Sequence, residues 1–182
     1  MSARTFGYRP SPPDARDQVY LMDVPHRART LPVRKTWRMP RPPMDQGDRP
    51  HCVAYAWTAM LLAAPITGAK FLPSDTAGGV KQFTTALYTD ARTVDGLDDA
   101  EDGTTVRGAA KALKARGMLA GYLWGYDAEA IAGYVLTRGP VVLGVNWYAG
   151  FSDADMGVMR RMCAVGRDTL TTGAASNGGS TS

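Results

Sequence analysis

The segment from Cys52 to Ala63 constrains the fold of this chain more than any other feature. It contains neither glycine nor proline, and its residues are apolar on nearly all sides of a helix. A helix with this pattern is buried, because it has no polar face to turn toward water. With 182 residues the chain is long enough to bury such a helix without disulfides or metals. We therefore expect a single domain whose central helix begins at Cys52.

Further helices and one strand are predicted on the C-terminal side of this segment. Apolar residues recur at helical spacing after residue 80 and again after residue 105, and a short β-branched apolar run follows the breaker Gly139-Pro140. We expect helices at Val80–Arg92, from a cap at Asp102 or Thr104 to Gly117, and from a cap at Asp127 to Thr137, and a buried strand at Val141–Val145. Because the helices come first and the sheet begins late, the predicted fold class is α+β.

The two ends of the chain differ in composition from its middle. Nine of the twelve prolines fall in the first 50 residues, which predicts an extended arm with little regular structure. Residues 171–182 carry no charge and no large apolar side chain, so they have nothing to contribute to a core. We therefore expect a Pro/Arg-rich arm at 1–44, a folded body at 45–155 and a degenerate, disordered tail at 156–182.

Cysteine content and hydropathy bear on the location of the protein. The two cysteines, Cys52 and Cys163, are too few for a disulfide framework, which favours a reducing compartment. The first residues lack the apolar run of a secretory signal, and no stretch reaches the roughly 18 apolar residues of a membrane helix. We expect a soluble, cytoplasmic protein that does not associate with membranes.

Two charged clusters raise the question of ligands. Six basic residues lie between Val24 and Met44 without an acidic one, but prolines interrupt them, so we expect a solvated arm rather than nucleic-acid binding. An acidic loop surrounds Asp98, yet a calcium-binding EF-hand starting there would place Ala109 where a bidentate glutamate is required. We expect no metal and no cofactor.

Cys52 lies at the predicted start of the buried helix, directly after a turn-rich loop that contains Gln46. Unpaired backbone N–H groups and the helix dipole favour negative charge at a helix N-terminus, which predicts a lowered thiol pKa and a reactive thiolate. The same N–H groups can stabilise an oxyanion, and the side-chain amide of Gln46 can supply a second donor. The alternative is that Cys52 is a small buried hydrophobic residue, as a lone cysteine at such a place more often is.

Several stretches along the chain match the pattern of one family, in order. Gln46 stands six residues before Cys52 and an apolar helix with aromatic residues follows, although His51-Cys52-Val53 replaces the family's usual small-residue-Cys-Trp. The other stretches are Phe6-Gly7-Tyr8-Arg9-Pro10, Pro13-Asp14-Ala15-Arg16-Asp17, Leu31-Pro32 through Arg38, Asp102-Gly103-Thr104-Thr105-Val106-Arg107, Lys111-Ala112-Leu113-Lys114 and Gly139-Pro140-Val141-Val142-Leu143-Gly144-Val145. Over residues 6–155 the chain thus resembles the bacterial and phage papain-like cysteine peptidases.

This resemblance implies a papain-like fold, with a helical lobe around the Cys52 helix and a β lobe after it. It implies Cys52 as the nucleophile, Gln46 as the oxyanion donor, and Gly103 and Thr104 beside the groove that receives the substrate backbone. The implied reaction is hydrolysis of a peptide or protein substrate through a thioester, without metal or cofactor. For Gly103 and Thr104 the alternative is a plain helix cap. A phage-encoded protein is compatible with the resemblance.

The general base of this family has no counterpart among the 182 residues. Its histidine would follow the strand at Val141–Val145, but no histidine occurs after His51. The side chain of His51 is expected to point away from that of its neighbour Cys52, and His26 lies in the arm. Asn146 and Asn177 follow no catalytic histidine. We therefore expect an impaired peptidase with an incomplete β lobe, whose unpaired strand edges promote self-association.

A truncation, or a frameshift from about Met156, would account for the missing histidine. Permitted codons for Arg167-Asp168-Thr169-Leu170 and the start of Thr171, read from the third base, encode Gly-His-Ala-Tyr, which is similar to the family's histidine segment. Three functions stay open: an impaired peptidase, a non-enzymatic peptide-binding or scaffold protein on the same fold, and a nucleic-acid-binding protein that acts through the basic arm. Peptide binding without turnover would favour the second of these functions, and salt-dependent retention on DNA would favour the third.

Overall fold

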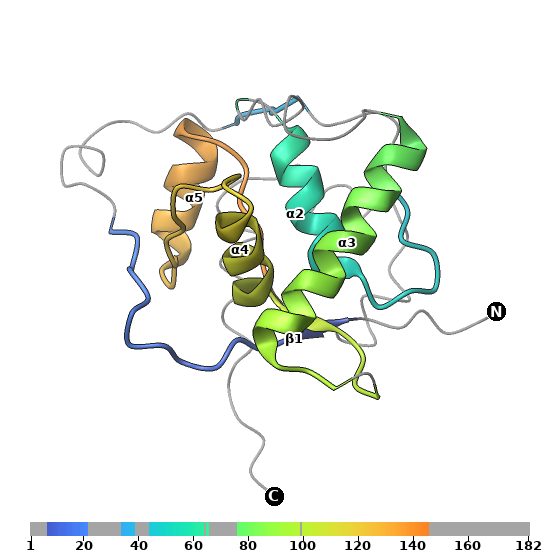
Figure 1. The fold of residues 1–182 in the computed structure, drawn as a ribbon. Helices are drawn as coiled ribbons and strands as arrows, with labels where there is room; N and C mark the ends of the chain where they lie inside the picture. The colour runs from blue at the N-terminus through green and yellow to red at the C-terminus, as the bar shows by residue number, and fades with distance from the viewer. Residues whose placement is uncertain are drawn as a thin grey trace, which may run out of the picture. The chain divides into compact units, whose positions relative to one another are not determined.

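The computed structural model describes residues 7–21, 34–38, 44–63, 65, 76–98 and 100–145. These ranges contain four helices and one two-stranded sheet, so the described part of the fold is mixed α and β (Figure 1). The elements are β1 (Tyr8–Arg9), α2 (Cys52–Leu62), α3 (Ala77–Asp95), β2 (Thr104–Thr105), α4 (Val106–Ala115) and α5 (Ala128–Thr137). The described residues fall into two compact units, one within 7–16, 37–122 and 140–145, and the other within 17–36 and 123–139.

Helices α2, α3 and α4 pack against one another in the first unit (Figure 1). The predicted central helix is confirmed, since α2 begins at Cys52 and ends at Leu62, one residue before the predicted end. Its buried side chains meet an apolar stripe on each of the other two helices, and this contact forms the core. The buried apolar residues of the three helices are Val53, Ala54, Trp57, Leu61, Val80, Phe83, Leu87, Ala91, Val106, Ala109, Ala110, Ala112 and Leu113.

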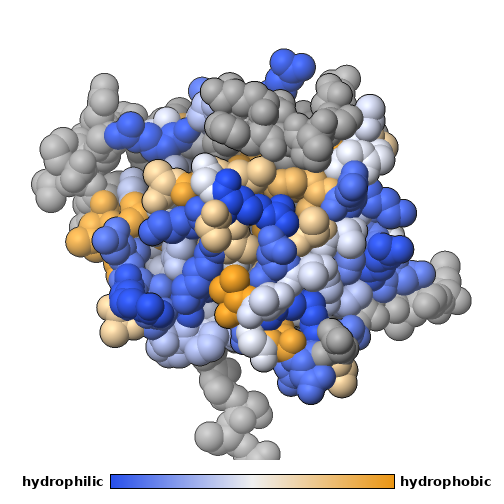
Figure 2. Space-filling model, viewed as in Figure 1, coloured by the Kyte–Doolittle hydropathy of each residue, from blue (hydrophilic) through white to orange (hydrophobic). Residues whose placement is uncertain are grey.

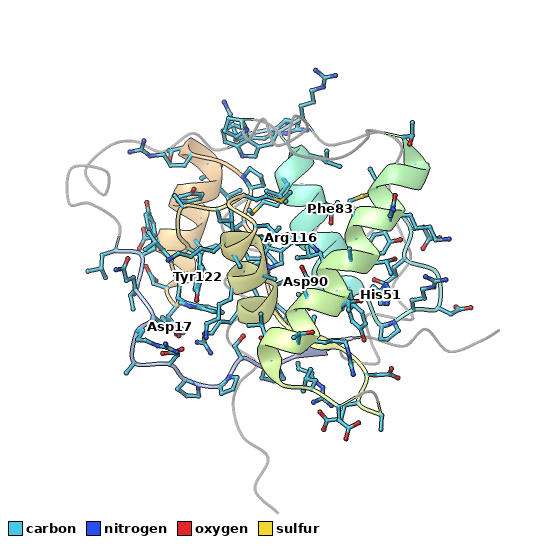
Figure 3. The ribbon with its side chains drawn as sticks, in the orientation of Figure 1. Asp17, His51, Phe83, Asp90, Arg116 and Tyr122 are labelled. Atoms are coloured by element: carbon cyan, nitrogen blue, oxygen red, sulfur yellow. The ribbon has the colours of Figure 1, made fainter. Side chains whose placement is uncertain are left out.

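Polar contacts supplement this core. Between α2 and α3 the hydroxyl of Thr84 donates a buried hydrogen bond of 3.1 Å to the hydroxyl oxygen of Thr58. Between α3 and α4 the guanidinium of Arg116 donates to Asp90 at 2.8 Å and lies over the ring of Phe83 (Figure 3). These contacts fix how α3 lies against both of its neighbours.

Helix α3 is longer than the predicted Val80–Arg92 by three residues at each end. The hydroxyl oxygen of Thr76 accepts from the backbone N–H of Gly79 and caps the start of the helix. At the other end Gly96 adopts a left-handed conformation with φ 65°, which glycine tolerates without a steric cost. The termini of α3 are therefore set by one side-chain cap and one glycine.

The predicted cap of α4 is wrong by one residue or more. Thr105 is the N-cap, and its hydroxyl oxygen accepts from the backbone N–H of Gly108 at 2.8 Å. Thr104, one residue earlier, does not cap the helix, and its hydroxyl donates to Asp95 at 2.6 Å. The helix ends at Ala115, before the predicted stop at Gly117.

The one sheet among the described residues does not begin late in the chain, as the sequence predicted. Strand β1, from the arm, pairs in parallel with β2, so that Tyr8 stands opposite Thr104 and Arg9 opposite Thr105. The partners are therefore about a hundred residues apart in sequence. Part of the predicted arm thus belongs to the same compact unit as α2, α3 and α4.

The predicted buried strand at Val141–Val145 is not found. These residues are described but have no regular structure, and Leu143 and Val145 are 48% and 55% exposed. A strand requires a neighbour for its backbone N–H and C=O groups, and no described strand pairs with this segment. Self-association through an incomplete β lobe stays a prediction.

The second unit contains α5, and here the sequence prediction is confirmed. Asp127 caps the helix by accepting from the backbone N–H groups of Glu129 and Ala130. The ring of Tyr20 packs edge-on against that of Tyr134 on α5, with centroids 5.3 Å apart. An isolated bridge between Val19 and Trp124 also joins the described part of residues 17–36 to this unit.

On the face shown in Figure 2, hydrophilic residues cover much of the described surface and hydrophobic residues form smaller areas. No helix in the described ranges is long and apolar enough to cross a membrane. Several sequence predictions concern residues outside the described ranges, so they stay predictions. They are His26, most of the basic run at 24–44, Asn146, Asn177, Cys163 and the tail at 156–182.

Candidate functional site

Cys52 is the first residue of α2, which is where the sequence predicts it. His51 precedes it as the N-cap residue, and the backbone C=O of His51 accepts the first hydrogen bond of the helix, from Tyr55 at 3.0 Å. The thiol of Cys52 is free and half-buried. The side chain therefore stands at the positive end of a helix whose other residues form the core of the first unit.

Burial raises the pKa of the Cys52 thiol above its ordinary value. Hydrogen bonds from the backbone N–H groups of Gly7, Val53 and Cys52 itself favour the thiolate and oppose this shift, but desolvation is the larger effect. The expected lowering of the pKa is therefore wrong. The N–H groups that would support a thiolate or an oxyanion are present, yet burial keeps the sulfur protonated at neutral pH.

Gln46 lies in the loop before α2, and its side chain forms a hydrogen bond with the backbone of the same loop. Its amide nitrogen donates to the carbonyl oxygen of Arg49 at 2.9 Å. This bond closes the turn that delivers the chain to His51 and Cys52. A role for Gln46 as an oxyanion donor stays a prediction, and the bond to Arg49 supports a structural role in positioning the start of α2.

Gly103 and Thr104 lie beside β1 of the arm. The backbone N–H of Thr104 donates to the carbonyl oxygen of Gly7 at 2.9 Å, and a Cβ atom on Gly103 would overlap that same carbonyl. Gly103 has φ 90°, so a side chain is excluded there by backbone conformation as well as by space. The structure therefore brings the predicted groove residues and Cys52 together around one residue, Gly7.

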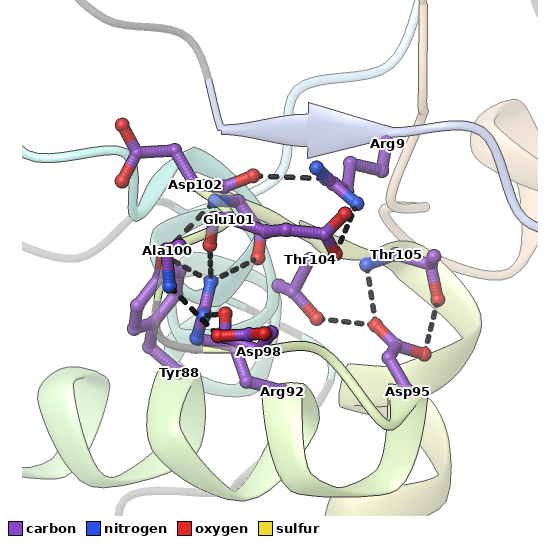
Figure 4. A network of polar contacts seen from close by, with 11 residues as sticks. Arg9, Tyr88, Arg92, Asp95, Asp98, Ala100, Glu101, Asp102, Thr104 and Thr105 are labelled. Carbon is purple, nitrogen blue, oxygen red and sulfur yellow. Dashed lines mark hydrogen bonds and ion pairs between the residues drawn. The ribbon is translucent and has the colours of Figure 1, made fainter.

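A network of polar contacts holds the loop before β2 (Figure 4). The guanidinium of Arg92, on α3, donates to the backbone carbonyls of Asp98, Glu101 and Gly103. The hydroxyl oxygen of Tyr88, one turn earlier, accepts from the backbone N–H of Gly103 at 3.0 Å. The last turns of α3 thus fix the position of Gly103.

Asp95 completes the same network (Figure 4). Its carboxylate accepts from the hydroxyl of Thr104 and from both the N–H and the hydroxyl of Thr105, at 2.6, 2.8 and 2.9 Å. A Cβ atom on Gly108 would overlap this carboxylate, so glycine is required where α4 passes it. Asp95 therefore anchors β2 and the start of α4 to the end of α3.

His51 is buried, and its ring packs on that of Tyr88 with centroids 3.9 Å apart (Figure 3 labels His51). Burial lowers the pKa of His51 first of all, and the charge of Arg49 lowers it further. The imidazole is thus directed toward α3 and stays neutral at neutral pH. This contact supports the prediction that His51 is not placed as the base for Cys52.

Sequence reasoning missed Gly7, Tyr88, Arg92 and Asp95. Gly7 has a sequence signal, because it lies in the Phe6-Gly7-Tyr8-Arg9-Pro10 stretch that resembles a family landmark, but nothing local indicates which residues it meets. In the sequence Arg92 is the last residue of the predicted helix, and Asp95 is expected to be a solvated charge of the acidic loop after it. Among the described residues, no group of three or more His, Cys, Asp or Glu side chains is placed to hold a metal ion.

No family model, no curated protein and no solved structure matches this chain.

Proposed function

We propose that this chain is a papain-like cysteine peptidase domain in which Cys52 is the nucleophile, and that it has little hydrolytic activity. The single observation that supports the nucleophile most is that Cys52 is the first residue of α2, where the unpaired backbone N–H groups of a helix start favour a thiolate. In the proposed reaction the Cys52 thiol loses its proton and its sulfur attacks the carbonyl carbon of a peptide bond. The C–N bond breaks as the thioester forms, and the amine leaves with a proton taken from water. A water molecule then hydrolyses the thioester to a carboxylic acid and the free thiol. A reducing, cytoplasmic setting is part of the proposal, because the thiol must stay free.

Two observations support impaired turnover. The raised pKa of Cys52 leaves little thiolate at neutral pH, and the ring of His51 is held against Tyr88. Loss of a general base typically lowers the rate of such a reaction by about 10²–10⁴-fold. The remaining functions of the site are to bind an extended peptide and to react slowly through Cys52.

A non-enzymatic peptide-binding function is the second candidate, and the pairing of β1 with β2 favours it. The edge at Thr104 and Thr105 already holds an extended backbone, that of Tyr8 and Arg9. Addition of a strand to a sheet edge is a common way for proteins to bind peptides. Both candidates use the same edge, and they differ in whether the peptide is cleaved.

A peptidyl epoxide and a mixture of fluorogenic peptides test the proposal together. We expect slow covalent labelling at Cys52 that disappears in Cys52→Ala, and peptide turnover no faster than that of Cys52→Ala. A Cys163→Ala variant is the matched control and should label like the wild type. Labelling that survives in Cys52→Ala would contradict the nucleophile, and turnover that depends on Cys52 at the rate of an ordinary peptidase would contradict the impairment.

A further inference from the structure

Residues 7–14, which we name the strap, make polar contacts with residues 101–111, which we name the receiving edge. The N–H of Thr104 donates to the carbonyl of Gly7, and β1 continues the pairing through Tyr8 and Arg9. Ser11 then accepts from the backbone N–H of Arg107 at 3.3 Å. The guanidinium of Arg107 also donates to the Pro12 carbonyl, and Lys111 pairs with Asp14 at 3.3 Å. Along its length the strap therefore lies on the receiving edge as a bound peptide would.

The first residue of the strap meets the thiol. The backbone N–H of Gly7 acts to lower the pKa of the Cys52 thiol, so Gly7 lies near the sulfur, and the C=O of Gly7 accepts from the N–H of Thr104. A Cβ atom on Gly7 would overlap the carbonyl oxygen of Pro50. Only glycine fits between Pro50 and Gly103, so a peptide bound in this place needs glycine next to the thiol.

The third residue of the strap meets an acidic position. The Nε atom of Arg9 donates to the backbone carbonyl of Asp102 at 2.9 Å, and its Nη1 atom pairs with the Glu101 carboxylate at 3.0 Å (Figure 4). The side chains of Arg9 and Glu101 are 36% and 45% exposed, so a competing arginine can reach the same two acceptors from solvent. The Asp102 carbonyl and the Glu101 carboxylate thus favour arginine at this position of a bound peptide.

We propose that the receiving edge binds extended peptides with glycine beside Cys52 and arginine two residues later, and that the strap is an internal copy of this ligand. The inference rests on the proposed function, since it names the peptide that the same site takes. Glu101 is then a specificity-determining residue. The strap competes with any external peptide, because a tethered segment has an effective concentration in the millimolar range.

Fluorescence anisotropy with a labelled peptide of the strap sequence, Gly-Tyr-Arg-Pro-Ser-Pro-Pro-Asp, tests the inference on the full chain. In Gly7→Val the new side chain collides with Pro50 and displaces the strap, so we expect the peptide to bind about tenfold or more tighter than to the wild type. Gly121→Val is the matched control, because a Cβ atom at Gly121 meets nothing within 4 Å, and it should bind like the wild type.

A charge exchange tests the arginine position. In the Gly7→Val background, a peptide with alanine in place of arginine should bind about two- to fivefold more weakly, the loss expected for one part-exposed ion pair. Glu101→Arg should weaken binding of the original peptide and restore binding of a peptide that carries glutamate in place of arginine. The inference would be overturned if the Gly7→Val and wild-type chains bound the peptide with equal affinity. It would also be overturned if replacing the peptide's arginine or Glu101 left the affinity unchanged.

Two further measurements separate this inference from the proposed function and from misfolding. Peptide binding should persist in Cys52→Ala, so binding without any reaction at Cys52 would contradict only the proposed nucleophile. Arg9→Glu loosens the strap by placing like charges together without a steric clash, and it should also raise peptide affinity, whereas Lys81→Glu on the exposed side of α3 should not. Reaction at Cys52 without peptide binding in either strap variant would contradict only the inference.

Discussion

The indole Nε1 of Trp57 donates a buried hydrogen bond of 3.2 Å to the backbone carbonyl of Val106. This bond joins the helix that begins with Cys52 to the residue that directly follows β2. Helix α2, which begins with the thiol, and the start of α4, which belongs to the receiving edge, are therefore held together by a hydrogen bond as well as by apolar packing.

Replacement of Trp57 by phenylalanine tests this tie. Trp57→Phe removes the hydrogen bond and part of the buried ring, and we expect the free energy of unfolding to fall by about 1–3 kcal/mol. Urea denaturation measures this change. An unaltered midpoint would show that the bond to Val106 contributes nothing to the packing of α2 on α4.

Glycine at position 108 is predicted to be irreplaceable, whereas glycine at 78 is not. A Cβ atom on Gly108 would overlap the carboxylate of Asp95, but at Gly78, in the first turn of α3, it meets nothing within 4 Å. Gly108→Ala should lower the unfolding free energy by about 1–3 kcal/mol, and Gly78→Ala should raise it by a few tenths to about 1 kcal/mol. Thermal unfolding of the pair measures both, and a stabilised Gly108→Ala variant would contradict the close approach.

Removal of the Asp95 carboxylate should disturb β2 more than any exposed acid does. Asp95→Ala deletes the acceptor of three hydrogen bonds from Thr104 and Thr105, and we expect a loss of about 2–4 kcal/mol. Asp48→Ala, in the exposed loop before α2, is the control and should change stability by less than about 0.5 kcal/mol. Hydrogen exchange should locate the loss at residues 104–108; uniform exchange along the chain would contradict a local anchor.

His51 should make stability depend on pH below neutrality. Its pKa is lowered in the folded state, so the unfolded state binds more protons between that pKa and the ordinary value of 6.5. The unfolding free energy should therefore fall as the pH falls through this window. His51→Phe keeps a ring against Tyr88 and should flatten the curve below the ordinary pKa of 6.5. An identical slope in the variant would assign the effect to another group.

Local patterns in the sequence predict the helices well. The all-apolar segment after Cys52 gives α2 its first residue, and Asp127 caps α5 as expected, because capping and burial depend on neighbours within a turn or two. The same reasoning misses the cap of α4, since Thr104 and Thr105 are adjacent residues of the same type and either is capable of capping.

Contacts between distant segments are what the sequence does not predict. The pairing of Tyr8 with Thr104 spans α2 and α3, and no short-range pattern marks either residue as a strand. The run at Val141–Val145 has strong β propensity, yet propensity without a partner strand does not make a strand. The pKa of Cys52 is missed for a similar reason. The sequence shows that Cys52 starts a helix, which lowers the pKa of the thiol. It does not show which residues pack around the thiol, and their burial of the sulfur raises the pKa by more.

The rate of Cys52 alkylation as a function of pH tests the central claim, that this thiol opens a helix but has no activating base. In a Cys163→Ala background, where Cys52 is the single cysteine, iodoacetamide reacts only with the thiolate. The account predicts that the rate rises with a midpoint above 9.0, the ordinary pKa of the thiol, and has no plateau near neutrality. A plateau between about pH 5 and about pH 7, as an ion-paired thiolate gives, would contradict it and show that a base acts on Cys52.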